Sequence, residues 1–102
     1  AFLAHALDET TLNALRDALA QIAPVGAAWL VRKRLTMADE QAHFTLLVTW
    51  RGSVASEDAG LKRILAAWPL PASVTVFGDS GQRALAKRVR EACPEPIYRK
   101  AR

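Results

Sequence analysis

The stretch Gly78-Asp79-Ser80 combines residue types that can support covalent chemistry, because it follows the apolar run VTVF and would present a serine at the end of a strand. A serine nucleophile needs a base within hydrogen-bond distance and a group that orients the base. The only two histidines are His5 and His43, and nothing in their spacing brings either one to Ser80. The sequence therefore favours Asp79 or Ser80 as the N-cap of a helix beginning at Ser80. It predicts no catalytic residue.

The sequence also gives no support for a metal site or for a bound cofactor. Cys93 is the single cysteine, so no internal disulfide is expected, and neither a second cysteine nor a histidine lies near it in the sequence. We expect a half-buried, inert thiol, no metal site and no cofactor. The absence of a disulfide framework fits a reducing compartment, and the expected location is the cytoplasm.

The composition is that of one ordinary globular domain. The chain has 102 residues, of which 51% are hydrophobic and 24% charged. Its apolar runs are far shorter than the roughly 20 residues that span a bilayer, so no membrane partner is expected. Residues 1–102 are predicted to form a single α+β domain. Because the chain begins AFLAHAL without methionine, we expect it to be a segment of a longer protein.

Three segments have helical spacing of apolar residues. The first runs from a cap at Asp8, Thr10 or Thr11 to Ile22, and its apolar face carries Leu12, Leu15 and Leu19. The second begins near Ser56 and ends before Pro69, with a predicted buried stripe of Leu61, Ile64, Leu65 and Trp68. The third runs from Ser80 to Ala92. Trp29, Trp50 and Trp68 occupy apolar positions and are predicted to belong to the core.

Strand patterns separate these helices. They cover FLAHAL at 2–7, residues 27–35 and 43–51 as a hairpin, and SVTVF at 73–77. The resulting order predicts a two-layer α+β sandwich with ferredoxin-like βαββαβ order and an additional C-terminal helix. Its second sheet face is left free or is covered by the C-terminal segment. Alternation predicts a half-exposed sheet face that carries Thr45, Leu47, Thr49 and Arg51 together with Arg32 and Arg34.

Positive charge is concentrated at the end of the chain. The net charge is +4, and from Arg83 onward there are seven basic residues and only two acidic ones. Arg83, Lys87 and Arg90 follow the spacing i, i+4, i+7, which places them on one side of the third helix. Such a stripe is either a solvated helix face or a contact for an acidic partner or a nucleic acid.

The same residues support a family resemblance. The helix in TLNALRDALAQIAPVGAAWL, the strand FTLLVTW and the ending PEPIYRK resemble the C-terminal domain of the enhanced serine sensitivity protein (SseB) family. Ala28, Trp29 and Leu30 match the start of a strand, and Pro96, Ile97, Tyr98 and Arg99 match the Pro-aromatic-Tyr ending, with Ile97 in place of the aromatic residue. The resemblance implies an α+β domain behind an N-terminal domain. It implies no reaction, because the family has no defined biochemical activity.

Taken together, these patterns predict a non-catalytic interaction or regulatory module of a cytoplasmic bacterial protein. The partner is a protein or an upstream domain, and a homo-oligomer is also compatible with the sequence. One alternative is nonspecific nucleic-acid binding through the basic helix, and another is a small-ligand domain that senses amino acids. The predicted partner-binding residues are Arg32, Arg34, Arg51, Arg83, Lys87 and Arg90.

Overall fold

The computed structural model describes residues 2–5, 7–22, 24–33, 43–68, 73–78 and 82–100. Within them the order of elements is strand, helix, strand, strand, helix, strand, helix, followed by a short last strand that the sequence did not predict. The bounds are β1 (Phe2–Ala4), α1 (Glu9–Ala20), β2 (Val25–Lys33), β3 (His43–Trp50), α2 (Val54–Ala66), β4 (Ser73–Gly78), α3 (Arg83–Ala92) and β5 (Tyr98–Arg99). The predicted α+β class is confirmed.

The strands form one mixed sheet in the order β1-β2-β3-β4, and β5 also pairs with β2. The predicted hairpin is confirmed, because β2 and β3 are antiparallel. Strand β1 is antiparallel to β2, whereas β4 is parallel to β3. The ferredoxin-like order is not confirmed. In that fold the first strand lies between the third and the fourth, whereas here β1 pairs with β2 at one side of the sheet.

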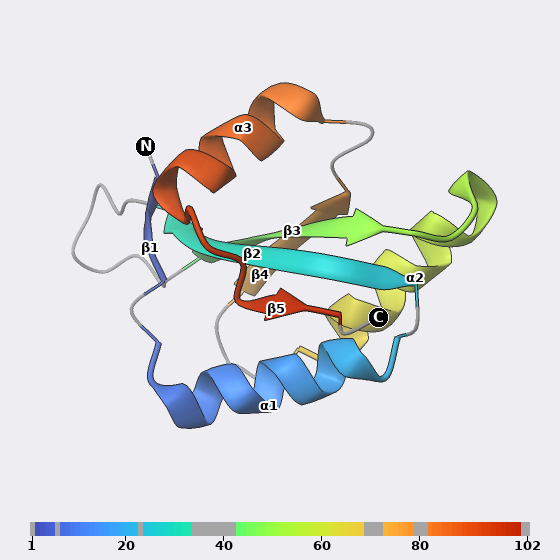
Figure 1. Ribbon diagram of the computed structural model, residues 1–102, viewed down its shortest axis with the longest axis horizontal. Helices are drawn as coiled ribbons and strands as arrows, with labels where there is room; N and C mark the ends of the chain where they lie inside the picture. Colours follow the sequence, from blue (N-terminus) through green and yellow to red (C-terminus); the bar gives the residue numbers. More distant parts are fainter. Residues whose placement is uncertain are drawn as a thin grey trace.

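Helices cover both faces of this sheet (Figure 1). Helices α1 and α2 lie on one face, where Leu15 and Leu19 share a buried core with Leu30 and Leu46. Helix α3 lies on the other face and packs Ala86 and Val89 against Val31, Leu47 and Phe77. The structure therefore has three layers rather than the predicted two. The face predicted to be half exposed is partly covered by α3, so Thr45 is only 5% exposed and Leu47 is 0% exposed.

Helix α1 agrees with the sequence prediction. The Asp8 carboxylate accepts a hydrogen bond from the Thr11 backbone N–H at 2.9 Å, and so caps the first turn. Arg16, on the polar side of the helix, donates from Nε to the Ile97 carbonyl oxygen at 2.6 Å. This bond ties α1 to the segment that leads into β5.

Helix α2 differs from the prediction at its start and on one face. The helix begins at Val54, and the Ser53 hydroxyl caps it by accepting from the Ser56 N–H. Ile64 is buried as expected, but Leu65 is 51% exposed and does not belong to the core. The reason is geometric, because successive helical residues point about 100° apart and the buried stripe centred on Ile64 is too narrow to include Leu65.

Helix α3 begins at Arg83, three residues later than predicted. Gln82 occupies the N-cap position and makes no side-chain cap hydrogen bond. Asp79 and Ser80, the predicted N-cap residues, lie outside the described residues. Packing of Ala86 and Val89 against the sheet, rather than a side-chain cap, holds this helix in place.

His5, which follows β1, is predicted to make stability depend on pH. Its Nδ1 accepts a hydrogen bond from the Leu7 N–H at 3.0 Å. Partial burial and, secondarily, the nearby Arg16 guanidinium lower the pKa of His5 below its ordinary value of 6.5. The unfolded chain therefore takes up this proton more readily than the folded one. The contribution of His5 to stability is complete above pH 6.5 and is lost as the pH falls through the lower folded-state pKa.

Urea unfolding measured from pH 8 down to pH 5 should show a decreasing free energy of unfolding below about pH 6.5. In His5→Asn, whose amide oxygen can accept the same N–H without titrating, this decrease should be smaller. An undiminished decrease in that variant would assign the pH dependence to other groups.

Candidate functional site

A cationic surface lies on the α3 side of the sheet, and the strand register places one of its members, Arg99. Residues directly opposite in antiparallel strands point to the same face. Ala27 is opposite both Thr49 on β3 and Arg99 on β5, and Trp29 is opposite Leu47. Since Leu47 packs under α3, this whole set lies on the α3 face. Arg99 is therefore exposed on the same side of the sheet as Trp29.

Helix α3 contributes three further cations to this surface. The Arg90 guanidinium carbon lies over the Trp29 ring, 4.7 Å from its centroid. Because Lys87 and Arg83 are about one and two turns earlier on the same side of the helix, they extend the row that Arg90 begins, and both are exposed. The contact with Trp29 therefore orients one side of α3 toward the part of the sheet that carries Arg99.

Arg51 completes the surface from the end of β3. A Cβ atom built at Gly26 would lie 2.6 Å from Arg51 Nε, so the arginine side chain crosses Gly26, the neighbour of Ala27. Val25 and Trp50, the residues before Gly26 and Arg51, are register partners that pack in the α1–α2 core. The register shifts between Val25 and Ala27, so Arg51 is placed here by its closeness to Gly26, the neighbour of Ala27, and not by strand alternation. We define the cationic surface as Arg51, Arg83, Lys87, Arg90 and Arg99.

Two predicted partner-binding residues are not part of it. Arg32 is opposite Phe44, whose side chain packs in the α1–α2 core, so Arg32 lies on the other face of the sheet. Its Nε donates to the Ala4 carbonyl oxygen at 2.9 Å and ties β2 to β1. The prediction that Arg32 shares a face with Thr45 and Leu47 is therefore wrong, because those two residues lie on the α3 face. Arg34 lies outside the described residues.

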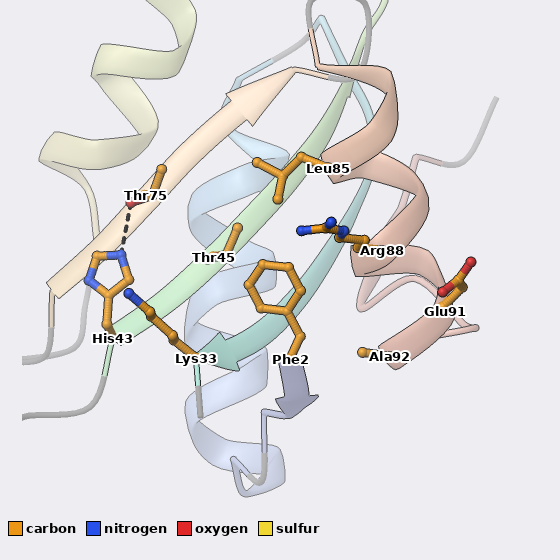
Figure 2. Close-up of a pocket in the computed structure, with 9 residues that line it drawn as sticks. All are labelled: Phe2, Lys33, His43, Thr45, Thr75, Leu85, Arg88, Glu91 and Ala92. Carbon is orange, nitrogen blue, oxygen red and sulfur yellow. Dashed lines mark hydrogen bonds between the residues drawn. The ribbon is translucent and has the colours of Figure 1, made fainter. Parts of the chain in front are cut away.

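On the same face, a pocket of about 870 Å³ opens between α3 and the end of the sheet where β3 begins (Figure 2). The described residues that line it come from five elements and combine cations, hydroxyls and apolar groups. They are Phe2, Lys33, His43, Thr45, Thr75, Leu85, Arg88, Glu91 and Ala92. Thr45 belongs to the sheet face that was predicted to be half exposed and to take part in partner binding, and none of the others was predicted as a site residue.

The imidazole of His43 is fixed at one wall of this pocket. Its Nε2 lies 2.8 Å from Thr75 Oγ1, and its Nδ1 lies 2.8 Å from Ser73 Oγ. In a neutral imidazole one ring nitrogen donates and the other accepts, so one hydroxyl accepts from the ring while the other donates to it. Parallel pairing of β3 with β4 brings both hydroxyls to the ring, a contact that the spacing of these residues in the sequence does not indicate.

The charged side chains that line the pocket point in different directions. Figure 2 shows Arg88 reaching from α3 into the pocket and the Lys33 side chain running toward His43 at its wall, while the Glu91 carboxylate points away. The ion pairs in the described part of the chain join Arg16 to Glu9 and Lys62 to Asp58. Neither Lys33 nor Arg88 is therefore neutralised by a close carboxylate within that part, and the interior of the pocket is electropositive.

Cys93 lies between the two cores as a partly buried thiol. Burial raises the pKa of its thiol, which lowers the thiolate fraction at neutral pH. Its Sγ donates to the Glu95 carbonyl oxygen at 3.1 Å. The expected partial burial of the Cys93 thiol is confirmed, and the raised pKa agrees with the expected low reactivity.

No metal site and no membrane-spanning helix is found in the described part of the chain, and no known relative is found. Among the described residues, no three His, Cys, Asp or Glu side chains are grouped so that they could hold a metal ion. No helix within the described ranges has the length and apolar character needed to cross a membrane. No protein-family model matches the chain, and no curated protein matches it.

Proposed function

We propose that this domain is a non-catalytic interaction module that binds an acidic surface of a protein partner through the cationic surface. The observation that carries the proposal is the placement of four cations from α3 and β5 on one side of the sheet, beside Trp29, with Arg51 next to Gly26 at the end of β3. These residues are separated by up to 48 positions in the sequence. Their assembly on one face is a property of the fold.

The chemistry of the surface suits carboxylates. Four of its five cations are arginines, and a guanidinium can donate two parallel hydrogen bonds to one carboxylate. Stacking on Trp29 restrains the Arg90 side chain in the free protein, so less conformational entropy is lost when it binds. Arginine and tryptophan are also the residue types that contribute most binding energy at the centre of protein interfaces.

Nucleic acid is the second candidate, because the exposed cations Arg83 and Lys87 lie along a helix and would contact phosphates at successive positions. This binding would be nonspecific, and its affinity would fall steeply with salt. The same proposal includes the resemblance to the SseB family. It also includes a bacterial cytoplasmic location and an upstream domain as the partner.

Charge reversal tests the surface directly. We expect Lys87→Glu combined with Arg99→Glu to weaken binding of a short polyglutamate peptide at least tenfold, or about 1.4 kcal/mol, because each substitution replaces attraction with repulsion. Fluorescence anisotropy at several salt concentrations gives the affinity and its salt dependence. A single-stranded RNA of equal charge is titrated in parallel.

The matched control is Lys62→Glu combined with Arg63→Glu, which changes the net charge equally on α2, on the opposite face of the sheet. The control should change polyglutamate binding less than threefold. Equal weakening in both variants would show that only the net charge matters. Tighter binding of the RNA than of the peptide, lost in the Lys87 and Arg99 variant, would assign the surface to nucleic acid.

A further inference from the structure

We infer that the pocket between α3 and the start of β3 is a binding site for a small organic anion that carries one aromatic or aliphatic group. This site lies on the other side of α3 from the cationic surface, because Leu85, Arg88 and Ala92 line it whereas Arg83, Lys87 and Arg90 do not. It goes beyond the proposed function, and neither site requires the other.

The size of the pocket sets the class of ligand. A volume of about 870 Å³ is within the range of about 300–1,000 Å³ that is typical of small-molecule sites. The lining includes Thr75, Arg88 and Glu91, which are exposed, so a small molecule can reach the pocket from solvent. A macromolecular strand would instead need a continuous groove.

The charge of the ligand follows from Lys33 and Arg88. Their side chains line the pocket from two elements that are far apart in the sequence, and within the described residues neither has a close carboxylate (Figure 2). Two like charges held near one cavity repel each other, and an anion between them removes that repulsion. In Figure 2 the Lys33 ammonium end lies toward His43 and the Arg88 guanidinium lies beside Leu85 and Phe2, so an anion in the pocket would have a cation on either side.

The apolar part of the ligand follows from Phe2 and Leu85. Figure 2 shows the Phe2 ring and the Leu85 side chain next to Arg88, so an anion bound there would have its remaining atoms against apolar surface. An aromatic group stacked on Phe2 would be favoured by about 0.5–1.5 kcal/mol beyond the burial of its area. The pocket therefore selects for a charged end joined to an apolar body, rather than for an inorganic ion.

His43 makes the polar wall of the pocket rigid. Because both ring nitrogens are held by hydroxyls of β4, the ring does not need to be ordered when a ligand binds. The hydroxyl that accepts from the ring keeps its own O–H group, which is free to donate to an anion. Thr75, which lines the pocket, is placed to make this contact if the Nε2 atom carries the proton.

A free amino acid fits less well than a simple anion. Its ammonium group would be brought near Lys33 and Arg88, while Glu91, the acidic residue of the lining, points away from the interior (Figure 2). The structure thus separates two ligand classes that the sequence leaves open. Phenylacetate should bind more tightly than phenylalanine, which differs from it in carrying an ammonium group and one more carbon.

The test uses benzoate, phenylacetate and phenyl phosphate as probes, followed by ¹H–¹⁵N correlation spectra of the chain. Benzyl alcohol lacks the charge and acetate lacks the ring, so they are the matched controls. We expect the aromatic anions to shift the amide resonances of β3, β4 and α3 around His43, Thr75 and Arg88. Their affinities should exceed those of both controls and of phenylalanine at least tenfold. Comparison of benzoate with phenyl phosphate then identifies the preferred anionic group.

Lys33→Gln combined with Arg88→Gln should lower the benzoate affinity at least tenfold, whereas Lys62→Gln combined with Arg63→Gln should leave it within twofold. Both changed positions in the pocket variant are exposed, so unfolding by urea should confirm a folded protein. The inference is overturned if benzoate shifts no resonance of the pocket at 20 mM, if acetate or benzyl alcohol binds equally well, or if phenylalanine binds more tightly than phenylacetate. Equal losses in both double variants would also overturn it.

Discussion

Leu46→Ala is expected to lower the free energy of unfolding by about 2–5 kcal/mol. Leu46 lies on β3 between β2 and β4, is 0% exposed, and belongs to the core shared with α1 and α2. Removing three carbon atoms there loses their burial and leaves a cavity, because paired strands on both sides prevent collapse. For a domain whose total stability is about 5–15 kcal/mol, this is a large fraction. Urea unfolding followed by circular dichroism measures the change.

Leu65→Ala is the matched control, with the same chemical change at a side chain that is 51% exposed. We expect a change within about 0.5 kcal/mol, since little area is lost and alanine is the better helix former. Equal losses at both positions would mean that α2 packs through Leu65, as its sequence pattern predicts, and not as the structure shows.

Gly60→Ala is expected to destabilise the protein by about 1–3 kcal/mol, although alanine is favoured over glycine in a helix by about 1 kcal/mol. Gly60 is buried in the middle of α2, where a Cβ atom would overlap the six-membered ring of Trp50. That ring is held in place, because Trp50 Nε1 donates to the Ser53 carbonyl oxygen and to Ser56 Oγ, each at 3.2 Å. Moving it would break both bonds and separate α2 from β3.

A double-mutant cycle with Trp50→Leu isolates the steric term. In the Trp50→Leu background the indole is gone, so Gly60→Ala should become stabilising by up to about 1 kcal/mol through helix propensity alone. A reversal of sign between the two backgrounds, measured by urea unfolding, identifies the contact with Trp50 as the cause. If Gly60→Ala has the same effect in both backgrounds, the close approach of Trp50 to α2 is refuted.

The elements were predictable wherever the signal is local. The Asp8 cap and the leucine spacing of α1 specify a helix, and the alternation in HFTLLVTW specifies β3. The order of the strands was not predictable in this way, because it depends on which strands pair across long separations. Leu65 was assigned to the core for a related reason. A stripe of apolar residues does not show how wide a contact its helix makes.

The cationic surface was predictable only in part. The i, i+4, i+7 spacing of Arg83, Lys87 and Arg90 does place them together on α3. The assignment of Arg32 failed because β2 is buried on both faces, so alternation within it does not separate exposed from buried residues. Arg99 was missed because two-residue strands such as β5 have no periodic pattern, although its basic character was visible in the sequence.

The pocket carried no local signal at all. His43 and Thr75 are 32 positions apart, and Phe2, Lys33 and Arg88 come from three further elements. The one pattern in the sequence related to the pocket is the alternation that places Ser73 and Thr75 on the same face of the strand SVTVF. That pattern becomes informative only when the parallel pairing of β4 with β3 is known.

The most direct test of the proposed function is a titration of the ¹⁵N-labelled chain with polyglutamate, followed by ¹H–¹⁵N correlation spectra. We expect the largest shifts at the amides of the cationic surface, which are those of Arg51, Arg83, Lys87, Arg90 and Arg99. These shifts should be lost in the Lys87→Glu, Arg99→Glu variant. Shifts centred on Lys33, His43 and Arg88 instead, or spread evenly over all exposed cations including Lys62 and Arg63, would contradict the proposed function.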